Sequence, residues 1–165
     1  MKTDSRGFSL IELLIVVAII LIIAAIAIPN LLRSRIAANQ ASAVGSLRTL
    51  NTSVITYAST YNGGYAAQLS YLGPGNGGNP STTQAGLIDS VLSGSGGNTS
   101  AKSGYNFGYT PGATDASGRI NTYAFTATPI TAGTTGTNYY FTDQSGVIRQ
   151  NSTAQASASD SPIAG

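Results

Sequence analysis

The residues of this chain that could do chemistry lie close to its N-terminus. Glu12 is the lone carboxylate of a long apolar run, and Phe8 stands one helical turn before it, directly after Gly7. A cut between Gly7 and Phe8 would create a free α-amino group on Phe8. We expect that amine to pair with the Glu12 carboxylate, within one helix or between neighbouring helices, because a charge in an apolar helix needs a partner. The alternative is that Glu12 is tolerated at the edge of the run and has no function.

The apolar run is long enough to cross a membrane. From Phe8 to Ile28 it consists mainly of Leu, Ile, Val and Ala, and its polar side chains are Ser9 and Glu12. A helix rises about 1.5 Å per residue, so this run covers roughly 30 Å, the usual hydrocarbon thickness. A secretory signal peptide places its apolar core before the cleavage site, whereas a cut at Gly7 would leave the core on the mature chain. The run therefore predicts a transmembrane helix with a working role, rather than the buried core helix of a soluble protein.

A specific motif occupies this part of the sequence. It reads Gly7-Phe8-Ser9-Leu10-Ile11-Glu12-Leu13-Leu14-Ile15-Val16-Val17-Ala18-Ile19 and closes with Ala27-Ile28-Pro29. The motif resembles the N-terminal signature of type IV pilins and of the related type II secretion pseudopilins. The resemblance implies that a membrane peptidase removes residues 1–7 on the cytoplasmic side and that the amine of Phe8 is methylated. It also implies that Glu12 pairs with the Phe8 amine of an adjacent subunit during fibre assembly.

An amphipathic segment follows the apolar run. Pro29 removes one helical N–H and crowds the carbonyl of Ala25, so we expect a bend there. Beyond it, apolar residues recur at three- and four-residue spacing, which predicts that the helix continues to about Tyr61 and stops at Asn62-Gly63-Gly64. These residues are Leu32, Ile36, Ala43, Leu47, Leu50, Val54 and Ala58. We therefore divide the chain into a cleaved leader (1–7), an apolar transmembrane and assembly helix (8–29), an amphipathic half belonging to the head (30–62) and a globular head (63–165).

The head begins with a Gly-rich loop region and continues with strands. We expect strands at Tyr105–Tyr109 and Tyr123–Ala127, the second ending before Pro129, and a hairpin of 139–142 with 146–149 across the turn 143–146. A short helix within 81–92, with Leu87, Ile88, Val91 and Leu92 on one face and Gly94 after it, precedes them. Residues 151–165 are Ser- and Ala-rich and predict a loose tail. The expected fold is α+β and pilin-like, a long N-terminal helix packed on a C-terminal antiparallel sheet of about four strands.

The composition argues against an enzyme, a cofactor or a metal centre. The chain has no His and no Cys, so the commonest bases, thiol nucleophiles and metal ligands are missing. A calcium site of Asp143, Asn138 and backbone carbonyls is conceivable, but Asp143 is better interpreted as a turn former. We interpret Tyr57 and Tyr61 as packing residues rather than an electron path. Three Asn-X-Ser/Thr sites, at Asn51, Asn98 and Asn151, are expected by chance in so polar a chain.

The charge of the chain bears on its partners, and its lack of cysteine bears on how the C-terminal region of the head is held in place. The formal net charge is +2, the basic residues are scattered, and no nucleic-acid motif is present. Many pilins close their C-terminal region with a disulfide. Without cysteine this chain must close it in another way.

Three functions of different class are compatible with these observations. The favoured one is a structural subunit held in the inner membrane as a single-pass precursor with a cytoplasmic leader, which polymerises through its N-terminal helix into an extracellular or periplasm-spanning helical filament. Its expected partners are copies of itself, the prepilin peptidase and methyltransferase, the inner-membrane pilus assembly machinery and lipid. The alternative is a pseudopilin of a type II secretion or DNA-uptake apparatus. A membrane-anchored binding module is disfavoured, because an anchor needs neither the Gly7 junction nor Glu12.

Overall fold

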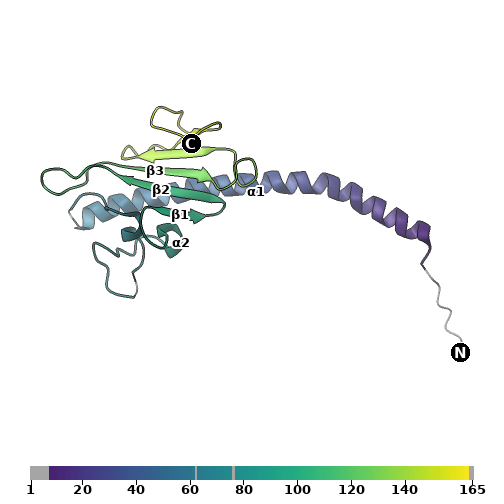
Figure 1. Ribbon diagram of the computed structural model, residues 1–165, viewed down its shortest axis with the longest axis horizontal. Helices are drawn as coiled ribbons and strands as arrows, with labels where there is room; N and C mark the ends of the chain where they lie inside the picture. Colours follow the sequence, from purple (N-terminus) through teal and green to yellow (C-terminus); the bar gives the residue numbers. More distant parts are fainter. Residues whose placement is uncertain (1–7, 62, 76, 164–165) are drawn as a thin grey trace. The chain divides into compact units, whose positions relative to one another are not determined.

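The computed structural model of the chain describes residues 8–61, 63–75 and 77–163 (Figure 1). The chain divides into two units, Met1–Arg35 and Ile36–Gly165. A single helix, α1 (Leu10–Tyr61), begins in the first unit and ends in the second. The second unit is called the head below.

Helix α1 is continuous from Leu10 to Tyr61, as the apolar and amphipathic patterns predict. Pro29 lies inside it without ending it. The bend at this residue stays a prediction. Two glycines lie just past the end of α1, and Gly64 has a φ of +84°, a backbone conformation that ends helices and that residues with a Cβ rarely adopt.

The head is built from two short helices and a five-stranded antiparallel meander in the order β1-β2-β3-β4-β5. Figure 1 shows the strands side by side. The pilin-like α+β fold is therefore confirmed, with one strand more than the expected four. The elements after α1 are η1 (Leu69–Leu72), α2 (Ser90–Ser93), β1 (Thr99–Lys102), β2 (Tyr105–Pro111), β3 (Tyr123–Pro129), β4 (Tyr139–Asp143) and β5 (Arg149–Asn151).

One face of α1 and one face of the sheet share a hydrophobic core. Leu47, Leu50 and Val54 of α1 are completely buried in one cluster with the aromatic side chains of the central strands. β2 and β3 alternate buried and more exposed residues, which is the pattern of strands with one covered face. Phe107 and Phe125 are among the largest fully buried side chains, and the burial of each contributes about 1.5–3 kcal/mol. The amphipathic half of α1 thus covers the sheet.

A polar group is buried inside this core. The Asn51 side-chain amide of α1 donates to the Thr142 hydroxyl of β4 at 2.9 Å, and its oxygen accepts from the Tyr123 hydroxyl of β3 at 3.3 Å. Buried polar atoms cost free energy unless they are paired. The group therefore fixes the position of α1 over β3 and β4 more specifically than apolar contacts alone would.

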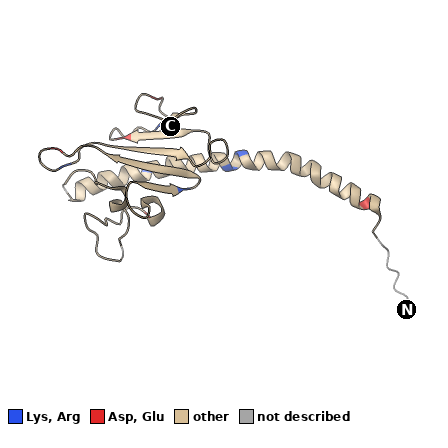
Figure 2. Ribbon diagram, in the orientation of Figure 1, with Lys and Arg blue, Asp and Glu red and all other residues tan. Residues whose placement is uncertain are grey.

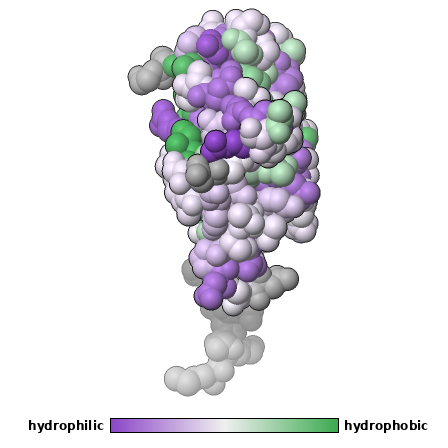
Figure 3. Space-filling view, turned by 90° about the vertical axis from the view of Figure 1, so that its left-hand side faces the viewer, coloured by the Kyte–Doolittle hydropathy of each residue, from purple (hydrophilic) through white to green (hydrophobic). Residues whose placement is uncertain are grey.

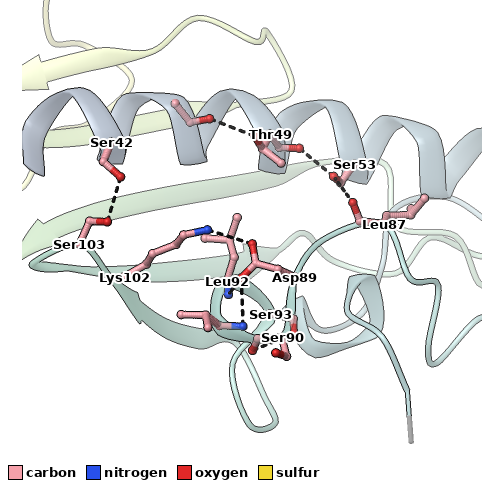
Figure 4. A network of polar contacts seen from close by, with 12 residues as sticks. Ser42, Thr49, Ser53, Leu87, Asp89, Ser90, Leu92, Ser93, Lys102 and Ser103 are labelled. Carbon is pink, nitrogen blue, oxygen red and sulfur yellow. Dashed lines mark hydrogen bonds and ion pairs between the residues drawn. The ribbon is translucent and has the colours of Figure 1, made fainter. Parts of the chain in front are cut away.

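Polar contacts also tie the β1 region to α1 (Figure 4). The Ser42 hydroxyl of α1 donates to the hydroxyl of Ser103 in the β1–β2 turn at 2.9 Å, and the Ser53 hydroxyl approaches the Leu87 carbonyl at 3.4 Å. Lys102 at the end of β1 forms an ion pair with Asp89 at 2.9 Å. These contacts position β1, a strand without large apolar residues, at the edge of the sheet.

The region before β1 differs from the prediction. The short helix covers Ser90–Ser93 and not 81–92, while Leu87 and Ile88 lie in extended chain whose amides donate to the Leu72 carbonyl. Val91 is exposed rather than on a buried face. The helix starts late because Asp89 caps it, its carboxylate accepting from the amides of Val91 and Leu92. Gly94 does end it, with a φ of +72°.

Two strand boundaries also differ from the prediction. β3 continues through Pro129, which pairs with Tyr105, because a missing N–H costs little at the last residue of a strand. β5 begins at Arg149 instead of residue 146. The turn of the predicted hairpin is confirmed, with the Gly146 amide donating to the Asp143 carbonyl at 2.9 Å.

The segment after β5, expected to be a loose tail, is held against the sheet as far as it is described. The Ile163 amide donates to the Ile148 carbonyl at 2.9 Å, and the Arg149 guanidinium donates to the Asp160 carbonyl at 2.9 Å. The Asp160 carboxylate accepts from the side chain of Asn151 and from the amide and hydroxyl of Ser157. Side-chain hydrogen bonds thus supply the anchoring that the sparse apolar residues did not predict. Together these contacts form what is called the C-terminal clasp below.

Candidate functional site: the N-terminal assembly segment

No residue of the apolar part of α1 is buried. An 18-residue window of this helix has a mean hydropathy of 3.3 and no buried residue, and α1 is the one helix among the described residues long and apolar enough to span a membrane. Contiguous exposed apolar surface on this scale indicates a membrane or protein contact. By contrast, Figure 3 shows a face of the molecule on which hydrophobic residues form only small, separate patches.

The first turn of α1 has a capping box. The Ser9 amide donates to the Glu12 carboxylate at 2.9 Å, and the Ile11 amide approaches the Ser9 hydroxyl at 3.4 Å. Ser at the N-cap and Glu three residues later satisfy helix N–H groups that have no partner inside the helix. The spacing Ser9-X-X-Glu12 is the sequence signal for this arrangement, and it is separate from the charge of Glu12 that indicated a role in pairing.

Glu12 is the one acidic residue of α1, and Figure 2 shows a single acidic position on this helix, near its N-terminal end. The positive end of the helix dipole favours a carboxylate in the first turn. Phe8 precedes the cap and is 80% exposed. The structure therefore places Phe8 and Glu12 in one exposed turn, while Gly7 and the rest of the predicted leader lie outside the described residues.

The residues considered for metal binding do not come together. Asn138 directly precedes β4 and Asp143 is its last residue. A strand rises roughly 3.3 Å per residue, so the two side chains lie at opposite ends of β4. The Asp143 carboxylate accepts from the Ser145 amide at 2.9 Å, as a turn former does. No cluster of three or more His, Cys, Asp or Glu occurs within residues 8–61, 63–75 and 77–163.

The remaining candidate residues have structural roles. Asn51 is buried in the core, and Asn98 and Asn151 accept backbone hydrogen bonds, so all three Asn-X-Ser/Thr sites are used by the fold. Tyr57 is buried with Tyr61 packed on it, the ring centroids 4.9 Å apart, which confirms their packing role.

Comparison with known proteins gives matches that each cover only part of the chain. The family model described as the prokaryotic N-terminal methylation motif matches residues 2–28. The type IV major pilin protein PilA of Myxococcus xanthus is 54% identical over 48 residues, which is 29% of this chain and 22% of that protein. The type IV wide pilus major component PilA4 of Thermus thermophilus is 64% identical over 36 residues, 22% of this chain and 28% of that protein. No solved structure matches this chain.

These matches confirm the prepilin-type motif, and with the long helix on an antiparallel sheet they support the type IV pilin family. The aligned region spans about a quarter of the length of the curated relatives. The family model, over residues 2–28, covers most of the apolar part of α1 and its first turn, which carry the candidate site.

Proposed function

We propose that this chain is the structural subunit of a type IV pilus-like filament, stored in the inner membrane and polymerised through the apolar part of α1. The observation that carries the proposal is an exposed apolar helix that begins inside a prepilin-type motif. A soluble protein could not leave such a helix in water, so it has to be covered by lipid before assembly and by other subunits afterwards. The extracellular or periplasm-spanning filament is the destination of the mature subunit.

Processing precedes assembly in this proposal. The prepilin peptidase cuts between Gly7 and Phe8, residues 1–7 are lost, and the new amine of Phe8 is methylated. The Glu12 carboxylate then pairs with the Phe8 amine of a neighbouring subunit. A subunit of this kind is structural and needs no catalytic group or cofactor. It needs the peptidase and methyltransferase, the assembly machinery and further copies of the chain.

The alternative is a pseudopilin of a type II secretion or DNA-uptake apparatus, which shares the processing and the helix. The names of both relatives describe pilus components, and this favours the pilus. The deciding experiment combines two measurements on native cells. Intact-mass analysis of the membrane protein tests for a chain that begins with methylated Phe8, and electron microscopy with subunit identification tests sheared surface filaments.

Surface filaments made of the processed chain support the pilin function. A processed chain that is absent from surface filaments would favour the pseudopilin. A chain that keeps residues 1–7, or that is cut after Ile28, would contradict both.

A further inference from the structure

Four tyrosines surround a cavity in the head, at the C-terminal end of α1. The cavity has a volume of about 200 Å³. Tyr57 and Tyr61 reach it from α1, Tyr65 from the segment after α1, and Tyr71 from η1. Gly118, in the connection between β2 and β3, also lines the cavity.

Packing inside the head holds the aromatic rings in place. The Tyr57 hydroxyl donates to the Thr82 carbonyl at 2.7 Å, and the ring of Tyr61 packs on that of Tyr57. The ring of Tyr65 meets Tyr123 edge to face with centroids 4.7 Å apart, and the Tyr65 amide donates to the Ile120 carbonyl at 2.7 Å. The walls are therefore fixed before any ligand arrives, which lowers the entropic cost of binding.

The chemistry of the lining selects a neutral ligand with both apolar and polar groups. Among the described residues, those that line the cavity carry no charge. Within the described part of the chain, the hydroxyls of Tyr61, Tyr65 and Tyr71 have no hydrogen-bond partner although each residue is half-buried. Tyrosine offers an apolar ring and a hydroxyl that donates and accepts. Gly118, with a φ of +80°, adds no side chain that would fill the space.

We propose that this cavity binds a single neutral six-membered sugar ring. A pyranose has C–H faces that pack on tyrosine rings and hydroxyls that reach the phenol groups. The volume is below the range of roughly 300–1,000 Å³ found for drug-sized ligands and suits one ring. A neutral sugar is favoured over a charged one because the described lining residues offer no counter-charge. This binding does not depend on polymerisation.

The test uses the full ¹⁵N-labelled chain in lauryldimethylamine oxide micelles, a detergent without sugar. Methyl β-D-glucopyranoside is the probe, and sorbitol, a neutral polyol without a ring, is the control. We expect saturable amide shifts in the millimolar range at Gly63, Tyr65 and Gly118. Tyr61→Ala should weaken binding about tenfold, a change of about 1.4 kcal/mol. Tyr71→Ala is the second variant, and Tyr139→Ala, a half-buried tyrosine outside the cavity, should bind as the unaltered chain does.

Three results would overturn the proposal. The first is the absence of local shifts, or equal shifts with sorbitol. The second is binding that stays unchanged in both cavity variants. The third is the same shifts on raising the protein concentration without sugar, because the occupant would then be a side chain of a second copy.

Discussion

Glu12 accepts a hydrogen bond from the Ser9 amide, and that amide would survive a cut between Gly7 and Phe8, because it belongs to the Phe8–Ser9 peptide. The carboxylate therefore has two separable roles. It caps α1 inside one chain, and in the proposed filament it supplies the counter-charge for the Phe8 amine of a neighbour. A substitution that keeps one role and removes the other can distinguish them.

Glu12→Gln is that substitution. A glutamine at the third position of a capping box still accepts from the N-cap amide, but it carries no charge. We expect normal membrane insertion and processing with a strongly reduced filament yield, because the Phe8 amine would be buried without its partner. Glu12→Val, which loses the cap as well, should give the same defect. Filament yield is measured against the amount of processed subunit in the membrane. Normal filaments from Glu12→Gln would show that capping is the whole role of Glu12.

Thr142 tests the buried polar group of the head. Thr142→Val keeps the shape of the side chain but leaves the Asn51 amide without its acceptor in the core. An unpaired buried donor costs about 1–3 kcal/mol, so the free energy of unfolding should fall by that amount. Thr110→Val, on the exposed side of β2, is the control and should change it by less than about 0.5 kcal/mol. Urea unfolding measures the free energy of unfolding of both variants. Equal losses in Thr142→Val and Thr110→Val would mean that the Asn51 side-chain amide finds another acceptor.

At the scale of elements, the β1–β2 turn tests how closely α1 is packed on the head. Gly104 and Gly133 both have a φ of +77°, but a Cβ on Gly104 would lie 2.7 Å from the Asn39 amide of α1, whereas a Cβ on Gly133 would meet nothing. Gly133→Ala should cost about 1–2 kcal/mol from backbone strain alone. Gly104→Ala should cost more, since the Asn39 side chain must also move and would strain its 2.9 Å hydrogen bond to the Thr135 carbonyl. Thermal unfolding of both variants measures the difference, and equal losses would show that the contact yields freely.

The elements that the sequence predicted well carry large apolar residues at a regular period. Helix α1 and strands β2 and β3 are of this kind, because aromatic and aliphatic side chains alternate or recur at the spacing of the element. Strand β1 was missed because Thr99–Lys102 has no such residue and is held by pairing with β2. Apolar spacing also predicted too long a helix for α2, because the start of this helix is set by the side-chain cap at Asp89.

Only part of the candidate site could be predicted from residue type and spacing. Phe8 and Glu12 were found from type and spacing, but the hydrogen bond from the Ser9 amide was not considered. The tyrosine cavity could not be predicted, because its lining comes from segments far apart in sequence. Nor could the C-terminal clasp, which depends on side-chain hydrogen bonds rather than apolar periodicity.

At the scale of the whole molecule, the division into two units predicts that the head folds alone. A chain beginning at Asn30 lacks the exposed apolar run and keeps the face of α1 that covers the sheet. We expect it to be soluble, monomeric and folded. Circular dichroism and size-exclusion chromatography provide the measurement. An aggregated or unfolded product would mean that the apolar run belongs to the core of the head.

The stability of that truncated chain should depend on pH at both extremes. Burial raises the pKa of Tyr123 to about 12, above its ordinary value of about 10. Its contribution to the free energy of unfolding is therefore complete below pH 10 and is lost as the pH rises towards 12. Hydrogen bonds from Ser157 and Asn151 lower the pKa of Asp160 below the ordinary value of an aspartate. Its contribution to the free energy of unfolding is therefore present above that ordinary pKa and is lost as the pH falls through the lowered one.

The two limbs can be separated by substitution. Tyr123→Phe should make the alkaline limb shallower without removing it, because burial also raises the pKa of Tyr57, Tyr105, Tyr109 and Tyr140. Asp160→Asn should likewise reduce the acidic limb, to which the lowered pKa values of Asp89 and Asp115 also contribute. Urea unfolding across pH measures both slopes. Tyr139→Phe, at a tyrosine that is not buried to the same extent, is the control for the alkaline limb. Limbs that keep their slope in the two variants would assign the titration to other groups.

The C-terminal clasp has a consequence for how the head can be produced. Hydrogen bonds around Asp160 and Arg149 hold this segment, and the chain contains no cysteine. A head closed by a disulfide needs an oxidising compartment and a thiol oxidase to mature. This head needs neither, so it can fold in a reducing cytosol during recombinant expression. In the proposed filament the head should also withstand dithiothreitol, a treatment that distinguishes this type of closure from a disulfide.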